Sequence, residues 1–218
     1  MHPARKALIS ARKQPQQARS ADLVAAILQA AVQVLTTEGA QRFTTARVAE
    51  KAGVSIGSLY QYFPNKAAIL FRLQSDEWQQ TTLLLTGILK DESRPPLVRL
   101  RALVHAFLQS ECDEAEVRGA LDDAAPLYRD APESKQAKAN SHRAMLAFMR
   151  EALPDAGQAE RVRAADLIKT TLSEVGKRFS ERPRSRAEIT AYADAMADMF
   201  CAYLEKAGAR RTTARSRN

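Results

Sequence analysis

Apolar residues recur at steps of three and four along most of this 218-residue chain. That spacing is the period of an amphipathic α-helix. The first such stretch can be capped by Ser20 or Asp22 and is ended by Gly39. Its apolar positions are Val24, Ile27, Leu28, Ala31 and Leu35.

The same period continues through the rest of the chain, and no segment shows a sustained alternation of apolar and polar residues. The pattern therefore predicts an all-α protein of about nine helices and no sheet. The later helices are expected over 66–90, 97–111, 114–128 with a bend near Pro126, from Pro132 to Leu153, 155–182 and 185–207.

The stretch 43–66, FTTARVAEKAGVSIGSLYQYFPNK, predicts two short helices joined by a tight turn. The first covers 46–52 and the second covers 56–62, and Gly53 supplies the positive φ that the turn between them needs. Pro64 ends the second helix because the residue before a proline is disfavoured in the α region. Two short helices joined in this way predict a helix-turn-helix unit.

The second of these helices is expected to enter a DNA major groove. Leu59 and Phe63 lie one turn apart and are expected to face inward, which leaves the rim to polar and aromatic side chains. The residues expected nearest the bases are Ser55, Ile56, Gly57, Ser58 and Gln61. Those expected to contact phosphates are Thr44, Thr45, Tyr60, Tyr62 and Lys66. The alternative is a helical hairpin with aromatic core residues and no DNA-binding role.

Charge favours the DNA-binding interpretation because the net +8 is unevenly distributed. Residues 1–72 hold 10 Lys and Arg against 3 Asp and Glu, whereas 73–208 hold 19 against 22 and 209–218 hold 4 against none. A basic head on a neutral-to-acidic body is typical of a protein that binds a polyanion. Residues 1–19 are expected to form a mobile basic arm, which either assists DNA binding or is a solvated tail.

At these residues the chain resembles the TetR family of bacterial transcriptional repressors. The resemblance rests on TTARVAEKAGVSIGSLYQYFPNKAAIL and on the preceding helix that ends at Glu38 and Gly39. It implies a DNA-binding domain over 20–72, a helical ligand-binding and dimerisation domain over 73–207, and a basic, disordered tail over 208–218.

The resemblance also implies a homodimer that binds a pseudo-palindromic operator on double-stranded DNA and is released by a small molecule. The last two long helices are apolar enough to pair with a second copy as a four-helix bundle. The expected ligand is hydrophobic, and its candidate lining is Trp78, Leu85, Leu103, Phe107, Met145, Phe148 and Met149. The alternative is an architectural or cell-division regulator of the same fold without an inducer.

Other functional classes lack a supporting motif. The sequence has no GxSxG, P-loop, HExxH or CxxC pattern, so we expect no enzyme, no metal site and no cofactor. Cys112 and Cys201 are expected to be small buried residues of a reduced, cytoplasmic protein, with a redox-sensing thiol as the alternative. No apolar run is expected to reach the roughly 18–20 residues that a membrane span needs.

Overall fold

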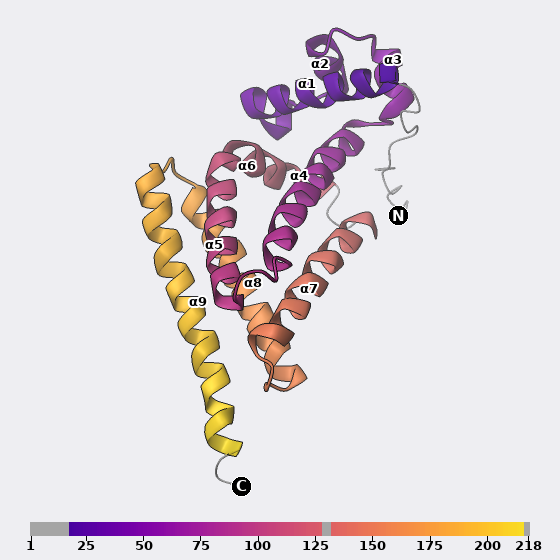
Figure 1. Ribbon diagram of the computed structural model, residues 1–218. Helices are drawn as coiled ribbons and strands as arrows, with labels where there is room; N and C mark the ends of the chain where they lie inside the picture. Colours follow the sequence, from indigo (N-terminus) through magenta and orange to yellow (C-terminus); the bar gives the residue numbers. More distant parts are fainter. Residues whose placement is uncertain (1–17, 128–131, 216–218) are drawn as a thin grey trace, which may run out of the picture. The chain divides into compact units, whose positions relative to one another are not determined.

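The structure is a computed structural model that describes residues 18–127 and 132–215, and within these ranges all regular structure is helical (Figure 1). The helices are α1 (Ala18–Arg42), α2 (Thr45–Lys51), α3 (Ile56–Tyr62), α4 (Lys66–Leu89), α5 (Pro96–Asp113), α6 (Ala115–Ala124), the 3₁₀ turn η1 (Ala125–Leu127), α7 (Pro132–Ala152), α8 (Gln158–Ser180) and α9 (Arg186–Arg215). The all-α prediction is therefore confirmed for the described part of the chain.

The chain divides into two compact units, which we call the head and the body. The head comprises Met1–Trp78 together with Glu116–Ala137, and the body comprises Gln79–Ala115 together with Lys138–Asn218. The sequence analysis instead assigned Glu116–Ala137 to the C-terminal domain over 73–207. The boundary runs through α4 and α7, so each of these helices contributes residues to both units.

The head is built around side chains of α1 to α4 and α6. Phe43, Leu59 and Phe63 are each at most 1% exposed, and Leu121 of α6 joins the same cluster. Burial of such side chains is the main favourable contribution to folding. The core therefore holds α2 and α3 in a fixed relation to α1, which is what a rigid DNA-contacting surface requires.

Helix α1 is longer and more apolar than the sequence analysis anticipated. By length and composition the segment Ser20–Arg42 could cross a membrane, so the expectation that no run reaches that length is wrong. Its apolar stripe is already used in the head, because Ile27, Ala31 and Leu35 are at most 1% exposed. Gly39 has φ 78° and kinks the helix where the sequence predicted its end.

The body core is formed by α5, α8 and α9 with parts of α4 and α7. Gly176 of α8 is buried at a close crossing with α5, where an added Cβ would lie 2.7 Å from Cε1 of Phe107. A side chain at this position would force the Phe107 ring to move. The glycine thus sets how closely α5 and α8 approach.

Two helix ends differ from the sequence prediction. Helix α6 stops at Ala124, because the ring of Pro126 cannot continue a regular helix, and a 3₁₀ turn follows. Helix α9 continues to Arg215 instead of giving way to a disordered tail at Gly208. A single interior glycine costs about 1 kcal/mol relative to alanine, which an already formed helix tolerates. The predicted basic arm lies outside the described residues, except that residues 18 and 19 begin α1.

Candidate nucleic-acid interface

Two side-chain caps and one glycine with a positive φ define α2, the turn after it and the start of α3. The Thr44 side chain caps α2 by accepting from the Arg47 amide at 3.3 Å, and Gly53 between the helices has φ 67°. The Ser55 side chain caps α3 by accepting from the Ser58 amide at 3.0 Å. Each cap satisfies a backbone donor that a helix start would otherwise leave unpaired. The predicted helix-turn-helix is therefore present.

The outer face of α3 is open to solvent. Ile56 and Tyr60 are 42% and 41% exposed, and Ser55, Gly57 and Gln61 are also exposed. Ser58 is half-buried, and its hydroxyl lies 2.8 Å from that of Ser55. The predicted base-facing residues thus share one end and one face of a short helix whose opposite face is packed into the head.

A hydrogen bond joins the start of α2 to this exposed face. The Thr45 hydroxyl lies 3.0 Å from the Tyr60 hydroxyl. The exposed Thr44 is the neighbouring cap residue, so the predicted phosphate-contacting side chains Thr44, Thr45 and Tyr60 come together. The sequence predicted that these side chains face outward, but it did not predict the hydrogen bond that joins the two helices.

Tyr62 does not lie at the rim, as the sequence analysis expected. It is only 6% exposed and belongs to the head core with Leu59 and Phe63. Residue 62 lies three positions after Leu59, and residues three or four apart share a helix face. Tyr62 therefore follows the inward stripe, whereas Tyr60 points outward.

The basic side chains near the helix-turn-helix differ in whether a carboxylate pairs with them. Arg47 is ion-paired with Glu38, and Arg72 pairs with Asp76 at 2.8 Å. Arg42 and Lys51 are exposed. The sequence analysis did not single out these two cations, which lie just before the α2 cap and at the C-terminus of α2.

Lys66 lies at the first position of α4 and is half-buried. The preceding Asn65 caps this helix, because its Oδ1 accepts from the Ala68 amide at 2.9 Å. A cation beside a helix N-terminus is a favourable place for an anion. The geometry fits the predicted phosphate contact of Lys66.

The predicted ligand-contacting residues are mostly packed into the body core. Leu103, Met145, Phe148 and Met149 are at most 7% exposed, and Leu85 and Phe107 pack against them. Trp78 is half-buried and belongs to the head. Two hollows in the body are lined by other residues, so the predicted ligand pocket remains a prediction.

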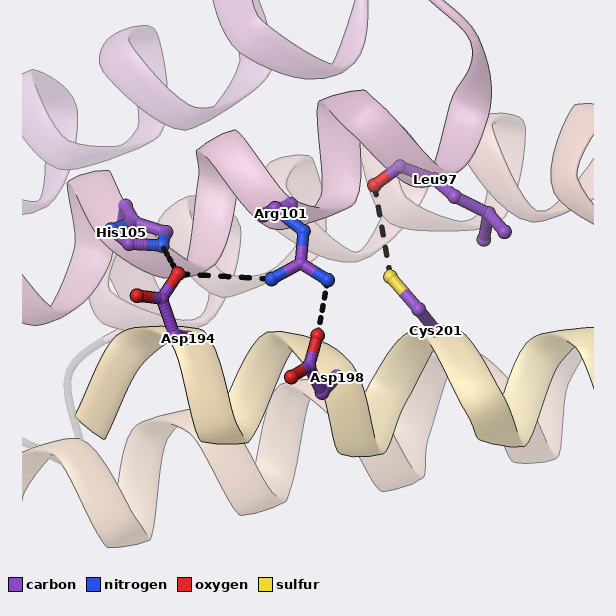
Figure 2. A network of polar contacts seen from close by, with 6 residues as sticks. All are labelled: Leu97, Arg101, His105, Asp194, Asp198 and Cys201. Carbon is purple, nitrogen blue, oxygen red and sulfur yellow. Dashed lines mark hydrogen bonds and ion pairs between the residues drawn. The ribbon is translucent and has the colours of Figure 1, made fainter. Parts of the chain in front are cut away.

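The two histidines of the described body each lie beside an aspartate. His105 lies 3.0 Å from an Asp194 carboxylate oxygen, and Arg101 pairs with Asp194 and Asp198, which ties α5 to α9 (Figure 2). His142 lies 3.7 Å from Asp166. No group of three or more His, Cys, Asp and Glu residues suited to a metal occurs among the residues that the structure describes.

The capped pair of short helices, the exposed α3 face and the nearby cations define a helix-turn-helix DNA-binding regulator. The family model described as "Bacterial regulatory proteins, tetR family" matches residues 27–73. A second model, "Tetracyclin repressor-like, C-terminal domain", matches residues 95–207. The chain belongs to the TetR family.

Solved structures of similar fold have low sequence identity. The fatty acid degradation regulator FadR from Bacillus halodurans has a TM-score of 0.66 and 17% identity, and the match covers 86% of this chain and 97% of that one. AmtR from Mycobacterium smegmatis has a TM-score of 0.56 and 24% identity, with 92% and 97% covered. These likenesses show the fold.

Curated relatives match over a shorter region. The nucleoid occlusion factor SlmA of Vibrio campbellii is 41% identical over 83 residues, which are 38% of this chain and 42% of that protein. SlmA of Alteromonas mediterranea is 37% identical over 84 residues, 38% of this chain and 43% of that protein. The matched region thus spans about two fifths of these relatives.

Proposed function

We propose that this protein is a homodimeric transcriptional repressor that binds a pseudo-palindromic operator through α3 and is released by a small hydrophobic molecule. The observation that carries the proposal is the exposed α3 face held over a buried head core. Ile56 and Tyr60 are more than two fifths exposed, whereas Leu59 between them is fully buried. A helix presented in this way fits the major groove, which admits one α-helix.

Dimerisation is supported by an unusual exposed stripe on α9. Tyr192, Ala195, Met199 and Ala202 follow at steps of three and four, and all four are exposed. Met199 is 51% exposed, and Leu167 of α8 is 47% exposed. Small and apolar residues on one exposed helix face are expected where a second helix packs. A second copy of α8 and α9 would complete a four-helix bundle.

A two-fold dimer constrains the DNA that it can bind. Its two α3 helices would read half-sites whose centres lie about 34–36 Å apart, or a multiple of that distance. An effector would release DNA only if it binds a second arrangement of the dimer more tightly than the DNA-bound one. The expected effector is hydrophobic because the body core is made of apolar side chains, mainly Leu and Ala with Met and Phe among them.

A fluorescence anisotropy titration tests the proposal. Labelled duplexes from the DNA upstream of the gene are titrated with the full chain, beside a scrambled duplex of equal length and composition. The expected result is tighter binding to one palindromic segment, with two chains per duplex. Equal affinity for scrambled and upstream DNA would show that the protein is not a sequence-specific regulator of its own promoter.

A second candidate function is DNA-bound regulation of chromosome organisation or cell division without an inducer. The observation that favours it is the 41% identity to the nucleoid occlusion factor SlmA over 83 residues. In that case binding sites would be scattered along the chromosome rather than placed at one promoter. Genome-wide mapping of bound sites separates the two, because a local repressor is expected at one or a few promoters.

A further inference from the structure

The chain turns from α1 into α2 through a corner formed by residues 38–45. Gly39 interrupts the regular helix of α1 with φ 78°. Phe43 then enters the head core, where it is fully buried, and the Thr44 side chain caps α2. The corner therefore decides where Thr44 and Thr45 lie, the two side chains of this segment that are predicted to contact phosphates.

Arg47, in the first turn of α2, holds this corner at three points. Its Nη1 is ion-paired with Glu38, which precedes the kink at Gly39. The same nitrogen donates to the backbone carbonyl of Arg42, beyond the kink, at 3.3 Å. The backbone amide of Arg47 donates to the Thr44 hydroxyl at 3.3 Å. One residue thus connects both sides of the kink to the start of α2.

The charge of Arg47 is already matched within the protein. Its side chain is 37% exposed and that of Glu38 is 31% exposed, so water reaches the pair only in part. Charge-assisted hydrogen bonds are stronger than neutral ones. Moving this guanidinium to a DNA phosphate would break the ion pair and the bond to the Arg42 carbonyl, and it would leave the Glu38 carboxylate unpaired. Arg47 is therefore better placed to hold the corner than to bind DNA.

We propose that Arg47 is a positioning residue of the DNA-binding surface, which contacts no DNA and fixes the corner so that Thr44 and Thr45 reach the phosphates. The same corner sets the Thr45 hydroxyl 3.0 Å from that of Tyr60 on α3. A surface already held in its bound arrangement binds more tightly, because less ordering is needed on association. An ion pair this exposed adds little to folding stability, so its effect is expected in DNA binding. The inference rests on the proposed binding of DNA through α3.

Salt dependence separates positioning from a direct phosphate contact. Arg47→Met removes the side-chain donors and the charge, and it is expected to weaken DNA binding about five- to tenfold at every salt concentration, as the loss of one or two hydrogen bonds would. The slope of log affinity against log salt should stay at the wild-type value. A slope smaller by about 0.9 would identify Arg47 as a phosphate contact and overturn the proposal. Unchanged affinity would overturn it as well.

The sign of a change at Glu38 gives a second, independent test. Glu38→Met takes away the partner of Arg47 and also removes one negative charge from the head. Positioning predicts weaker DNA binding, although the loss of a negative charge would by itself strengthen binding to a polyanion. The double variant with Arg47→Met should lose less than the sum of the two changes, because both remove the same ion pair. Tighter binding by Glu38→Met, or full additivity, would contradict the proposal.

Arg72→Met is the matched control. Arg72 pairs with Asp76 within α4, and the two side chains are 42% and 35% exposed, close to the values of the pair at the corner. This pair joins no two helices, so its loss should change DNA affinity far less than Arg47→Met does. Equal losses in the two variants would show a general effect of charge and refute a role for the corner. Circular dichroism melting checks that each variant is folded.

All variants are titrated on both the upstream duplex and the scrambled duplex. Phosphate contacts carry no sequence information, so the comparison of each variant with wild type holds on either duplex. Equal wild-type affinity for the two duplexes would contradict the proposed operator. The role of Arg47 is decided separately, by the variants against wild type.

Discussion

The hydroxyl groups of Thr45 and Tyr60 lie 3.0 Å apart and link the first turn of α2 to the exposed face of α3. The bond joins residues 15 positions apart in the two helices of the helix-turn-helix unit. It fixes the direction of the Tyr60 side chain at the edge of the surface expected to meet DNA. The first prediction follows from this pair.

Removing either hydroxyl is expected to weaken operator binding with little effect on folding. Tyr60→Phe and Thr45→Val should each cost about 0.5–1.5 kcal/mol of DNA-binding free energy, the usual net value of one hydrogen bond. The double variant should lose less than the sum, because both changes remove the same bond. Anisotropy titrations of the four proteins give the coupling energy, and full additivity would contradict a role for the bond in DNA binding.

Lys66 is expected to contribute one phosphate contact. Lys66→Gln should reduce the slope of log affinity against log salt by about 0.9, since each neutralised phosphate releases counterions in that proportion. The slope is measured by anisotropy titration at several salt concentrations. Lys90→Gln is the control, because Lys90 is an exposed lysine directly after the C-terminus of α4, the helix that Lys66 begins. Equal slopes in wild type and Lys66→Gln would remove Lys66 from the interface.

Gly176 is expected to be intolerant of even a methyl group. Gly176→Ala would place a Cβ 2.7 Å from the Phe107 ring, and such overpacking typically costs about 1–3 kcal/mol, which the better helix propensity of alanine offsets by up to about 1 kcal/mol. Urea denaturation of the full chain measures the loss. Gly87→Ala is the matched control, because a Cβ there meets nothing within 4 Å and alanine favours a helix by up to about 1 kcal/mol. If Gly176→Ala changed the stability by the same amount as Gly87→Ala, α5 and α8 would be less closely packed than the structure indicates.

The exposed α9 stripe predicts that a charge at its centre prevents dimer formation. Met199→Glu is expected to give a monomer in sedimentation velocity and to weaken operator binding. The dimer interface would otherwise bury one uncompensated carboxylate from each subunit. Leu83→Glu is the control, since Leu83 is 65% exposed and lies on α4 rather than on either C-terminal helix. A dimeric Met199→Glu protein would show that the subunits associate through another surface.

Both cysteine thiols are expected to react slowly near neutral pH. Burial raises the pKa of Cys112 and Cys201 above that of a free thiol, so each carries less thiolate at any given pH. Alkylation by iodoacetamide should therefore be slower than that of free cysteine at pH 8, and its rate should still be rising above pH 9. Fast modification at pH 7 would instead favour the redox-sensing alternative.

Local chemistry allowed much of this fold to be predicted. The Thr44 and Ser55 caps, the positive φ of Gly53 and the stop at Pro64 each act within a few residues, so the bounds of α3 follow from the sequence. The helical period acts in the same way over longer stretches. The outward position of Ser55, Ile56, Gly57 and Gln61 could be predicted for this reason.

The helices and the helix-turn-helix could be predicted without a structure, because caps, turns and periodicity depend on neighbours along the chain. The close approach of the Phe107 ring to Gly176 and the enclosure of Arg99 between three helices could be seen only in the folded structure. These outcomes depend on contacts between residues distant in sequence. Packing selects one of several helix faces that the pattern alone leaves equivalent.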